Sequence, residues 1–154
     1  APETGGLEVR LAREEDIPEI AQLSAETFGE SPEEARHLVE SAFRDGNRQN
    51  YAAYLDGKMV GLGGVNTGEP ELYIFGLGIS PQLQNKGLGR RMLAQLIRTI
   101  RQTDSREIVL EVDSENAAAF HLYTTSGFAV RTQYDYYEAK TADFVLPESG
   151  ITQL

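Results

Sequence analysis

The sequence predicts an α/β (α+β) domain built on one sheet, because strand-like and helix-like segments alternate along most of the chain. Its 154 residues are enough for one domain with its own hydrophobic core. Hydrophobic residues make up 40% and charged residues 25%, as in ordinary globular proteins. The absence of cysteine excludes disulfides, thiolate metal sites and a cysteine nucleophile.

The first half of the chain is predicted to contain two helices and the start of the sheet. Residues 7–11 alternate between apolar and polar, which indicates a strand, and residues 15–28 have the apolar spacing of a helix. A second helix is expected over residues 31–43, because Ser31 is a good N-cap and Glu34 completes a capping box.

A β-hairpin is expected next, formed by residues 50–55 and 58–66. The two strands are joined by Asp56-Gly57, a pair that favours a tight type I′ turn. Residues 71–80 form a third strand-like run in this part of the chain, and it contains two glycines. Glycine inside a strand marks a bulge or the close approach of another group.

The second half is predicted to alternate between helices and strands. The segments are a helix at 87–101, a strand at 107–112, a helix at 114–127 and a strand at 128–137. The first of these helices is the most regular, with its apolar residues on one face. The later helix is capped by Ser114 or Asn116 and ends at Gly127.

The formal net charge of -10 and the sequence pI of about 4.6 argue against nucleic-acid binding and favour amine-bearing partners. No apolar run is long enough to span a membrane, and residues 1–6 read as a linker rather than a signal peptide. The domain is therefore expected over residues 7–146, followed by a tail at 147–154. We expect a cytoplasmic protein, a monomer or homodimer, that is excised from a longer chain.

One segment reverses the acidic character of the chain. "QNKGLGRRM" (residues 84–92) contains three cations and no acid. Gly87 and Gly89 lie where the helix at 87–101 begins, so backbone N–H groups can converge on an anion at the positive end of the helix dipole. Phosphate fits this arrangement best.

The spacing separates this segment from two known phosphate loops. A Walker loop requires Lys-Ser/Thr where Arg90 and Arg91 stand, and a dinucleotide fingerprint requires a third glycine where Met92 stands. The pattern Q-x-x-G-x-G remains. On its own it is weak evidence, and a glycine-rich entry to an arginine-faced surface helix explains it equally well.

Two longer segments change that balance. "LGISPQLQNKGLGRRML" after a strand, followed by "LEVDSENAAAFHLYTTSGF", resembles the GNAT family of acetyltransferases, and within it the enzymes that acetylate the N-terminal alanine of ribosomal proteins. The resemblance covers most of the chain. It implies a single GNAT-like domain, with a mixed, mostly antiparallel sheet of about six or seven strands flanked by about four helices.

The same resemblance implies the co-substrate acetyl-CoA and assigns residues to it. Backbone amides would hold the coenzyme A pyrophosphate, with charge added by Lys86 and by Arg90 or Arg91; the loop residues are Gln84, Asn85, Lys86, Gly87, Leu88, Gly89 and Arg90. Leu77, Gly78 and Ile79 would pair with pantetheine. A side chain at Gly78 would block that approach, although the glycines of this strand also fit a role in relieving crowding in the sheet. Asn116 would contact the cofactor, a role compatible with capping the helix.

The resemblance also implies transfer of an acetyl group to a primary amine by direct attack in a ternary complex. Tyr123 matches the tyrosine general acid, with helix packing as the alternative. For the base we favour Glu111, which alternates with its apolar neighbours and so faces away from the core. Glu71 or a relayed water is the second choice. The backbone N–H of Ile79 would stabilise the oxyanion.

No metal is expected, because His37 and His121 have no partners at ligand spacing. The acceptor, a peptide N-terminus or a small amine, is expected to meet residues 24–35 and 134–139. Acidic residues make the first of these segments electronegative, namely Glu26, Glu30, Glu33 and Glu34. The alternatives are a non-catalytic acyl-CoA-binding module, such as one half of a tandem GNAT protein, and an ATP-binding protein.

Overall fold

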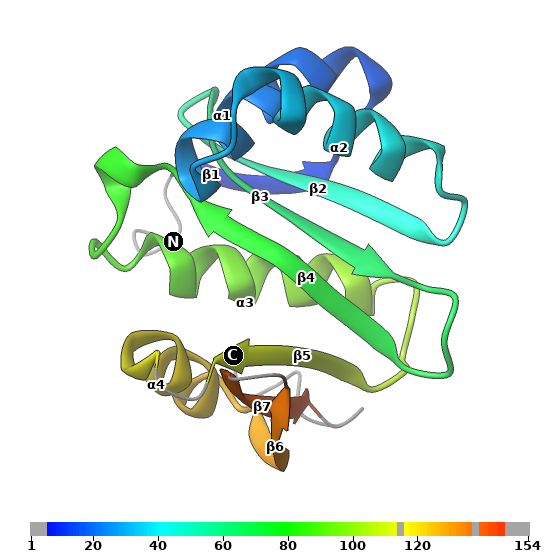
Figure 1. Ribbon diagram of the computed structural model, residues 1–154, viewed down its shortest axis with the longest axis vertical. Coiled ribbons are helices and arrows are strands. Elements are labelled where there is room, and N and C mark those ends of the chain that lie inside the picture. Colours follow the sequence, from blue (N-terminus) through cyan, green and yellow to red (C-terminus); the bar gives the residue numbers. More distant parts are fainter. Residues whose placement is uncertain (1–5, 114–115, 137–138, 147–154) are drawn as a thin grey trace.

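The computed structural model describes residues 6–113, 116–136 and 139–146. In that part of the chain, seven strands form one sheet with the order β1-β2-β3-β4-β5-β7-β6, and four α-helices cover its two faces (Figure 1). Among these described strands, only β4 and β5 pair in parallel. The predicted fold class is therefore confirmed.

The elements follow one another in the order that the sequence predicts, and the structure adds the strand β7 and two short 3-10 turns. The strands are β1 (Leu7–Leu11), β2 (Arg48–Leu55), β3 (Lys58–Asn66), β4 (Leu72–Ile79), β5 (Ile108–Asp113), β6 (Ala129–Tyr136) and β7 (Ala139–Leu146). The helices are α1 (Ile17–Phe28), α2 (Pro32–Arg44), α3 (Leu88–Arg101) and α4 (Ala117–Thr125), with short 3-10 turns η2 (Glu14–Asp16) and η3 (Pro81–Leu83). None of the helices in the described ranges is long and apolar enough to cross a membrane.

Local signals in the sequence produce the expected turns and caps. The Ser31 hydroxyl accepts a hydrogen bond from the Glu34 N–H at 3.1 Å, which caps α2. Asp56 and Gly57 have φ values of 51° and 87°, so both central residues of the β2–β3 turn are left-handed, as a type I′ turn requires. The hairpin and the cap are both confirmed.

Each face of the sheet has its own hydrophobic cluster. On one face α3 buries its whole apolar stripe, and Met92, Leu93, Leu96 and Ile97 are fully buried. On the other face α1 and α2 pack over β2 and β3 (Figure 1). The sheet thus separates two layers of helices, and α4 belongs to the layer of α3.

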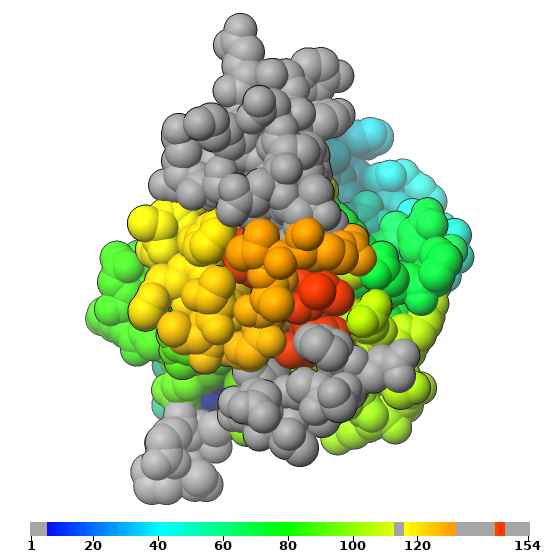
Figure 2. Space-filling view, turned by 90° about the horizontal axis from the view of Figure 1, so that it is seen from below, coloured from blue at the N-terminus to red at the C-terminus, as the bar shows by residue number. Residues whose placement is uncertain are grey.

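The residue pattern alone did not predict β7, although the implied count of six or seven strands includes it. This strand lies between β5 and β6 and pairs antiparallel with both. Phe144 and Leu146, two alternate residues at the end of β7, are fully buried and pack on the core. Viewed from below, α4 lies beside the start of β6, near the described end of β7 (Figure 2).

The pairing of β4 with β5 covers only three residues of each strand. Leu72–Ile74 pair with Ile108–Leu110, and beyond these residues the two strands diverge. Gly76 has a φ of 60°, a conformation that disfavours any residue with a side chain, and it lies between Phe75 and Gly78, where the register of β4 against β3 shifts. The bulge predicted in this strand is therefore present, and it lies where β4 leaves β5.

Candidate functional site

The edge of β4 beyond the bulge carries backbone groups that point away from the sheet. The Ser80 N–H donates to the Val60 carbonyl of β3 at 2.7 Å. Neighbouring residues in a strand direct their backbone groups to opposite edges, so the N–H and C=O of Ile79 and Leu77 face the open side towards β5. The N–H and C=O of Leu77 and the N–H of Ile79 can therefore pair with an additional extended chain, whereas the Ile79 carbonyl already accepts a hydrogen bond from Gln84.

A loop with left-handed residues joins this edge to α3. Asn85 and Gly87 have φ values of 64° and 79°, and no side chain caps the first turn of α3, which starts after Gly87. The amide side chain of Gln84 donates to the Ile79 carbonyl at 3.1 Å and ties the loop to the end of β4. Uncapped N–H groups at a helix start form an anion site.

The basic residues near this helix start differ in their contacts. Lys86 is exposed and makes no ion pair or hydrogen bond with the residues that the structure describes. The Arg90 guanidinium instead donates to the Thr125 hydroxyl at 2.7 Å and to the Ser126 hydroxyl at 3.2 Å. Arg90 therefore links α3 to the end of α4, a structural role that the sequence did not indicate.

Gly78 lacks a side chain for a reason that involves α1. A Cβ atom at Gly78 would lie 2.8 Å from the Thr27 methyl group and 3.0 Å from the Phe28 ring. Gly78 therefore relieves crowding, but the crowding comes from α1 and not from the sheet as expected. The predicted pairing of its backbone with a cofactor is a separate matter and stays a prediction.

The two candidate bases, Glu111 and Glu71, have different partners. Leu110 is buried against α3, so Glu111 points to the opposite face, as predicted, where its carboxylate accepts a hydrogen bond from the Tyr73 hydroxyl. Glu71 forms an ion pair with Arg131 of β6. Glu111 thus contacts a neutral donor across the diverging strands, whereas Glu71 already has a cationic partner.

Tyr123 lies on α4 with its ring packed into the core. The ring centroid is 5.8 Å from those of Phe128 and Phe144. Burial raises the pKa of the Tyr123 phenol above its ordinary value of 10.0. The packing alternative is therefore correct for the ring, and the hydroxyl stays protonated at neutral pH, as a proton donor must.

Asn116 caps α4, since its side-chain oxygen accepts a hydrogen bond from the Ala119 N–H at 3.1 Å. The alternative cap, Ser114, lies outside the described residues. His37 and His121 are exposed on α2 and α4. No group of three or more His, Asp or Glu side chains that could hold a metal ion occurs among the residues searched, which are the described ones.

A pocket of about 320 Å³ lies between α1, α2 and strands β2 to β4; we refer to it as the α1–α2 pocket. Its lining includes Phe75 and Gly76 at the bulge, Arg48 and Asn50 of β2, and Glu30 from the loop between the helices. It lies on the same face as Glu111. Of the two predicted acceptor segments, residues 24–35 reach this pocket, and the side chains of 134–139 lie outside the described set.

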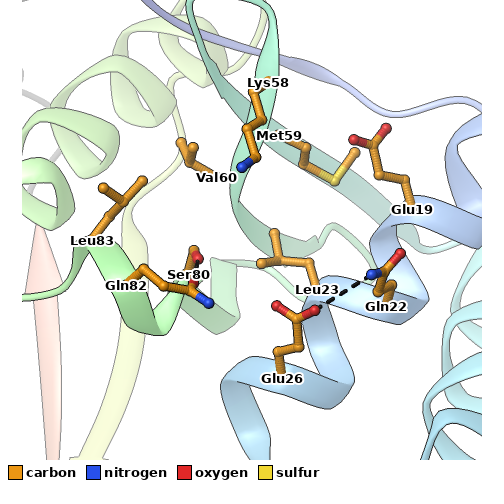
Figure 3. Close-up of a pocket in the computed structure, with 10 residues that line it drawn as sticks. All are labelled: Glu19, Gln22, Leu23, Glu26, Lys58, Met59, Val60, Ser80, Gln82 and Leu83. Atoms are coloured by element: carbon orange, nitrogen blue, oxygen red, sulfur yellow. Dashed lines mark hydrogen bonds between the residues drawn. The ribbon is translucent and has the colours of Figure 1, made fainter.

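A second cavity of about 410 Å³ shares no lining residue with the first. It lies between α1, the start of β3 and the segment 80–83 (Figure 3). Glu19 and Glu26 of α1 and Lys58 of β3 line it, and Gln22 donates to Glu26 at 3.5 Å. Two of the acidic residues predicted to meet the acceptor therefore line different cavities: Glu26 lines this one, and Glu30 lines the α1–α2 pocket.

The bulged strand and the uncapped helix start are features that the sequence resemblance predicts. The model of the acetyltransferase (GNAT) family matches residues 17–128. The chain belongs to this family. The resemblance to the GNAT family seen in the sequence motifs is therefore confirmed.

Among curated proteins, the mycothiol acetyltransferase of Propionibacterium freudenreichii is 27% identical over 150 residues, covering 89% of this chain and 48% of the relative. The [Ribosomal protein bS18]-alanine N-acetyltransferase of Escherichia coli is 33% identical over 89 residues, covering 57% of this chain and 60% of the relative. The chain thus spans about half the length of the mycothiol relatives that it matches.

Solved structures have the same fold. The ribosomal-protein-S18-alanine N-acetyltransferase of Escherichia coli superposes with a TM-score of 0.77 at 22% identity, covering 93% of this chain and 94% of that one. The spermidine N-acetyltransferase of Vibrio cholerae, solved with CoA and spermine, gives 0.78 at 18% identity, covering 96% and 98%. These likenesses show that the fold is shared over more than nine-tenths of the chain.

Sequence reasoning missed two residues that the fold brings to the site. Tyr73 reaches Glu111 from 38 positions away, and the guanidinium carbon of Arg48 lies 3.9 Å from the centroid of the Phe75 ring. For Tyr73 a signal existed, because its alternation with Leu72 and Ile74 predicts the same face as Glu111. Arg48 is the first residue of β2, and no motif in the neighbouring sequence indicated a functional role for it.

Proposed function

We propose that this chain is an acetyl-CoA-dependent N-acetyltransferase that moves an acetyl group to a primary amine. One observation carries the proposal: β4 leaves β5 beside the uncapped start of α3. An open strand edge suits the amide-bearing pantetheine arm, and a helix start suits the pyrophosphate. Coenzyme A carries both groups in one molecule.

The loop and strand residues would bind the cofactor as the sequence predicts. The amides of residues 84–90 would surround the pyrophosphate, and the exposed Lys86 would add charge. Leu77 and Ile79 offer backbone groups on the open edge, and Asn116 lies at the start of α4, the element that follows β5. Arg90 would act indirectly, by fixing the first turn of α3 against α4.

The chemistry would need no covalent intermediate. Glu111 would take a proton from the acceptor ammonium, directly or through water, and Tyr73 would orient its carboxylate. The amine nitrogen then bonds to the thioester carbon, and the Ile79 N–H would stabilise the oxyanion. As the carbon–sulfur bond breaks, Tyr123 would give its proton to the leaving sulfur, and the second proton lost by the nitrogen would return through water to the Tyr123 oxygen. A cytoplasmic location and a monomeric or dimeric state remain predictions.

A thiol-release assay tests this function. Purified protein with acetyl-CoA is mixed with a panel of peptide N-termini, polyamines, amino acids and aminoglycosides, and free thiol is measured over time. We expect at least one class of amine to be turned over. Tight binding of coenzyme A in calorimetry without turnover of any amine would favour the non-catalytic module, and tighter binding of ATP than of coenzyme A would contradict both readings.

A further inference from the structure

We propose that the α1–α2 pocket holds the acceptor, and that the acceptor is an amino acid with an apolar side chain whose carboxylate binds Arg48 and Asn50. The inference rests on the proposed acetyl transfer and specifies its substrate class. It is independent of the residues assigned to the cofactor. Four features of the pocket support it.

The first feature is the position of the pocket. Phe75 and Gly76 form part of its lining, and they directly follow Ile74, the last residue of β4 that pairs with β5. A ligand that fills the pocket therefore ends at the open strand edge. Tyr73 and Phe75 lie on the same face of β4, so the Tyr73–Glu111 pair is next to this end of the pocket.

The second feature is a cation with no acidic partner. The chain has 24 acidic and 14 basic residues, yet the Arg48 guanidinium forms no ion pair or hydrogen bond with any residue that the structure describes. The guanidinium carbon lies 3.9 Å from the centroid of the Phe75 ring, which holds this cation against the pocket wall. A guanidinium held in this way, with no polar partner among the described residues, is a preorganised receptor for a carboxylate.

The third feature is a neighbouring amide. Asn50 is two residues beyond Arg48 in β2, so both side chains leave the same face of the sheet, and both line the pocket. The Asn50 side chain also has no polar partner within the described ranges. Two adjacent donors on one wall match the two oxygens of a carboxylate.

The fourth feature is the composition of the remaining walls. They are mainly apolar, with contributions from Ile20, Val39 and Leu62, and the one acid among the described lining residues is Glu30. Ser24 donates a hydrogen bond to the Glu30 carboxylate at 2.9 Å and holds it in place. Glu30 disfavours a second acidic group on the ligand, and Arg48 disfavours a polyamine that would bring cations to it.

Three ligands of the same shape test the inference without any mutation. They are L-leucine, L-leucinamide, which loses the negative charge, and 3-methylbutylamine, which loses the carboxyl group altogether. We expect kcat/KM for L-leucine to exceed that for either analogue by at least ~10-fold, the usual effect of hydrogen bonds to a charged group. Equal or faster turnover of the analogues would overturn the assignment.

A substitution then identifies the receptor. Arg48→Gln should remove the preference for L-leucine over L-leucinamide and leave turnover of 3-methylbutylamine within about threefold. Arg44→Gln is the matched control, because it removes the same charge from an exposed position at the end of α2, outside the pocket. A preserved preference in Arg48→Gln would contradict the proposal, and thermal unfolding checks that both variants are folded.

Saturation-transfer NMR tests amino-acid binding in the pocket separately from acetyl transfer. L-leucine is added to protein saturated with coenzyme A, so that binding is observed without any reaction. Saturation transfer to L-leucine that disappears in Arg48→Gln and persists in Arg44→Gln supports the pocket even if no amine is acetylated. Turnover of other amines, together with no transfer to L-leucine, would overturn the substrate class and leave the acetyltransferase intact.

Discussion

The β4–β5 pair has a closed end, where Leu72–Ile74 pair with Ile108–Leu110, and an open end beyond these residues, and the two ends differ in their contacts. At the closed end the Leu72 N–H donates to the Glu107 carbonyl at 2.8 Å, and three residues of each strand pair in parallel. Arg106 adds hydrogen bonds to the carbonyls of Thr67 at 3.1 Å and Glu69 at 2.8 Å. At the open end, beyond Ile74, the strands no longer pair.

This difference shows how one pair of strands serves both stability and binding. The turn before β5 fastens the closed end to the β3–β4 connection. The left-handed Gly76 then changes the course of β4, and its backbone groups become available to a ligand. Substitutions at the closed end should therefore act on stability, and substitutions at the open end on binding and turnover.

The largest expected effect is on stability at the closed end. Leu72 is 1% exposed, so Leu72→Ala should lower the free energy of unfolding by about 2–5 kcal/mol. Leu77 is on the same strand beyond the bulge and is only partly buried, so Leu77→Ala should cost about 1 kcal/mol. Urea unfolding of both variants measures the contrast. An equal decrease in the free energy of unfolding in both variants would contradict the expected contrast between the two ends.

The next largest effect is on turnover at the open end. Tyr123→Phe keeps the ring packed against Phe128 and Phe144 but removes the proton donor. We expect kcat to fall by at least ~10²-fold, or about 2.7 kcal/mol, with coenzyme A affinity unchanged.

Tyr54→Phe is the matched control for this substitution. It removes the hydroxyl of a buried tyrosine on β2, the strand beneath α1 and α2, whose ring centroid lies 4.3 Å from the Arg10 guanidinium carbon. Steady-state kinetics should distinguish the two variants clearly. Native turnover in Tyr123→Phe would refute the role of Tyr123 as the general acid.

A smaller effect is expected at the bulge itself. A Cβ at Gly76 would meet no atom within 4 Å, so Gly76→Ala adds only backbone strain, about 1–2 kcal/mol. Gly46→Ala is the control, because Gly46 is equally open but does not have a positive φ. Thermal unfolding should show destabilisation for Gly76→Ala alone. Similar melting temperatures would mean that the bulge does not depend on glycine.

The smallest effect is the pH dependence of the closed end. The Arg106 side chain hydrogen-bonds Asp104 and lowers the pKa of that carboxyl below its ordinary 3.8. A lowered folded-state pKa contributes stability above about pH 4 and loses it as the pH falls through the folded value. The advantage over Asp104→Asn should be at most about 1 kcal/mol and should disappear in acid. Urea unfolding across this range measures it, and an advantage that persists in acid would contradict the assignment.

Local chemistry made much of the fold predictable. The Asp56-Gly57 turn, the Ser31 cap and the apolar stripe of α3 depend only on residues close in sequence, and the structure has all three. The glycines and cations of residues 84–90 likewise marked a helix start that has no side-chain cap. These features follow from backbone preferences and periodicity, which a sequence displays directly.

The missed features depend on contacts between distant segments. The pattern that identifies β7 is short, and its place between β5 and β6 is decided by the sheet. The reason for Gly78 is found in α1, about fifty residues earlier. The contacts of Arg48 with Phe75 and of Arg90 with α4 likewise join elements that only the tertiary fold brings together.

Amide hydrogen exchange with and without coenzyme A tests the central claim most directly. If the open end of β4 and the start of α3 bind the cofactor, exchange should slow at Leu77, Ile79 and residues 88–90. Exchange at Leu72–Ile74, where pairing is already complete, should not change. Saturating coenzyme A that leaves the open end unprotected, or that protects only other segments, would contradict the account.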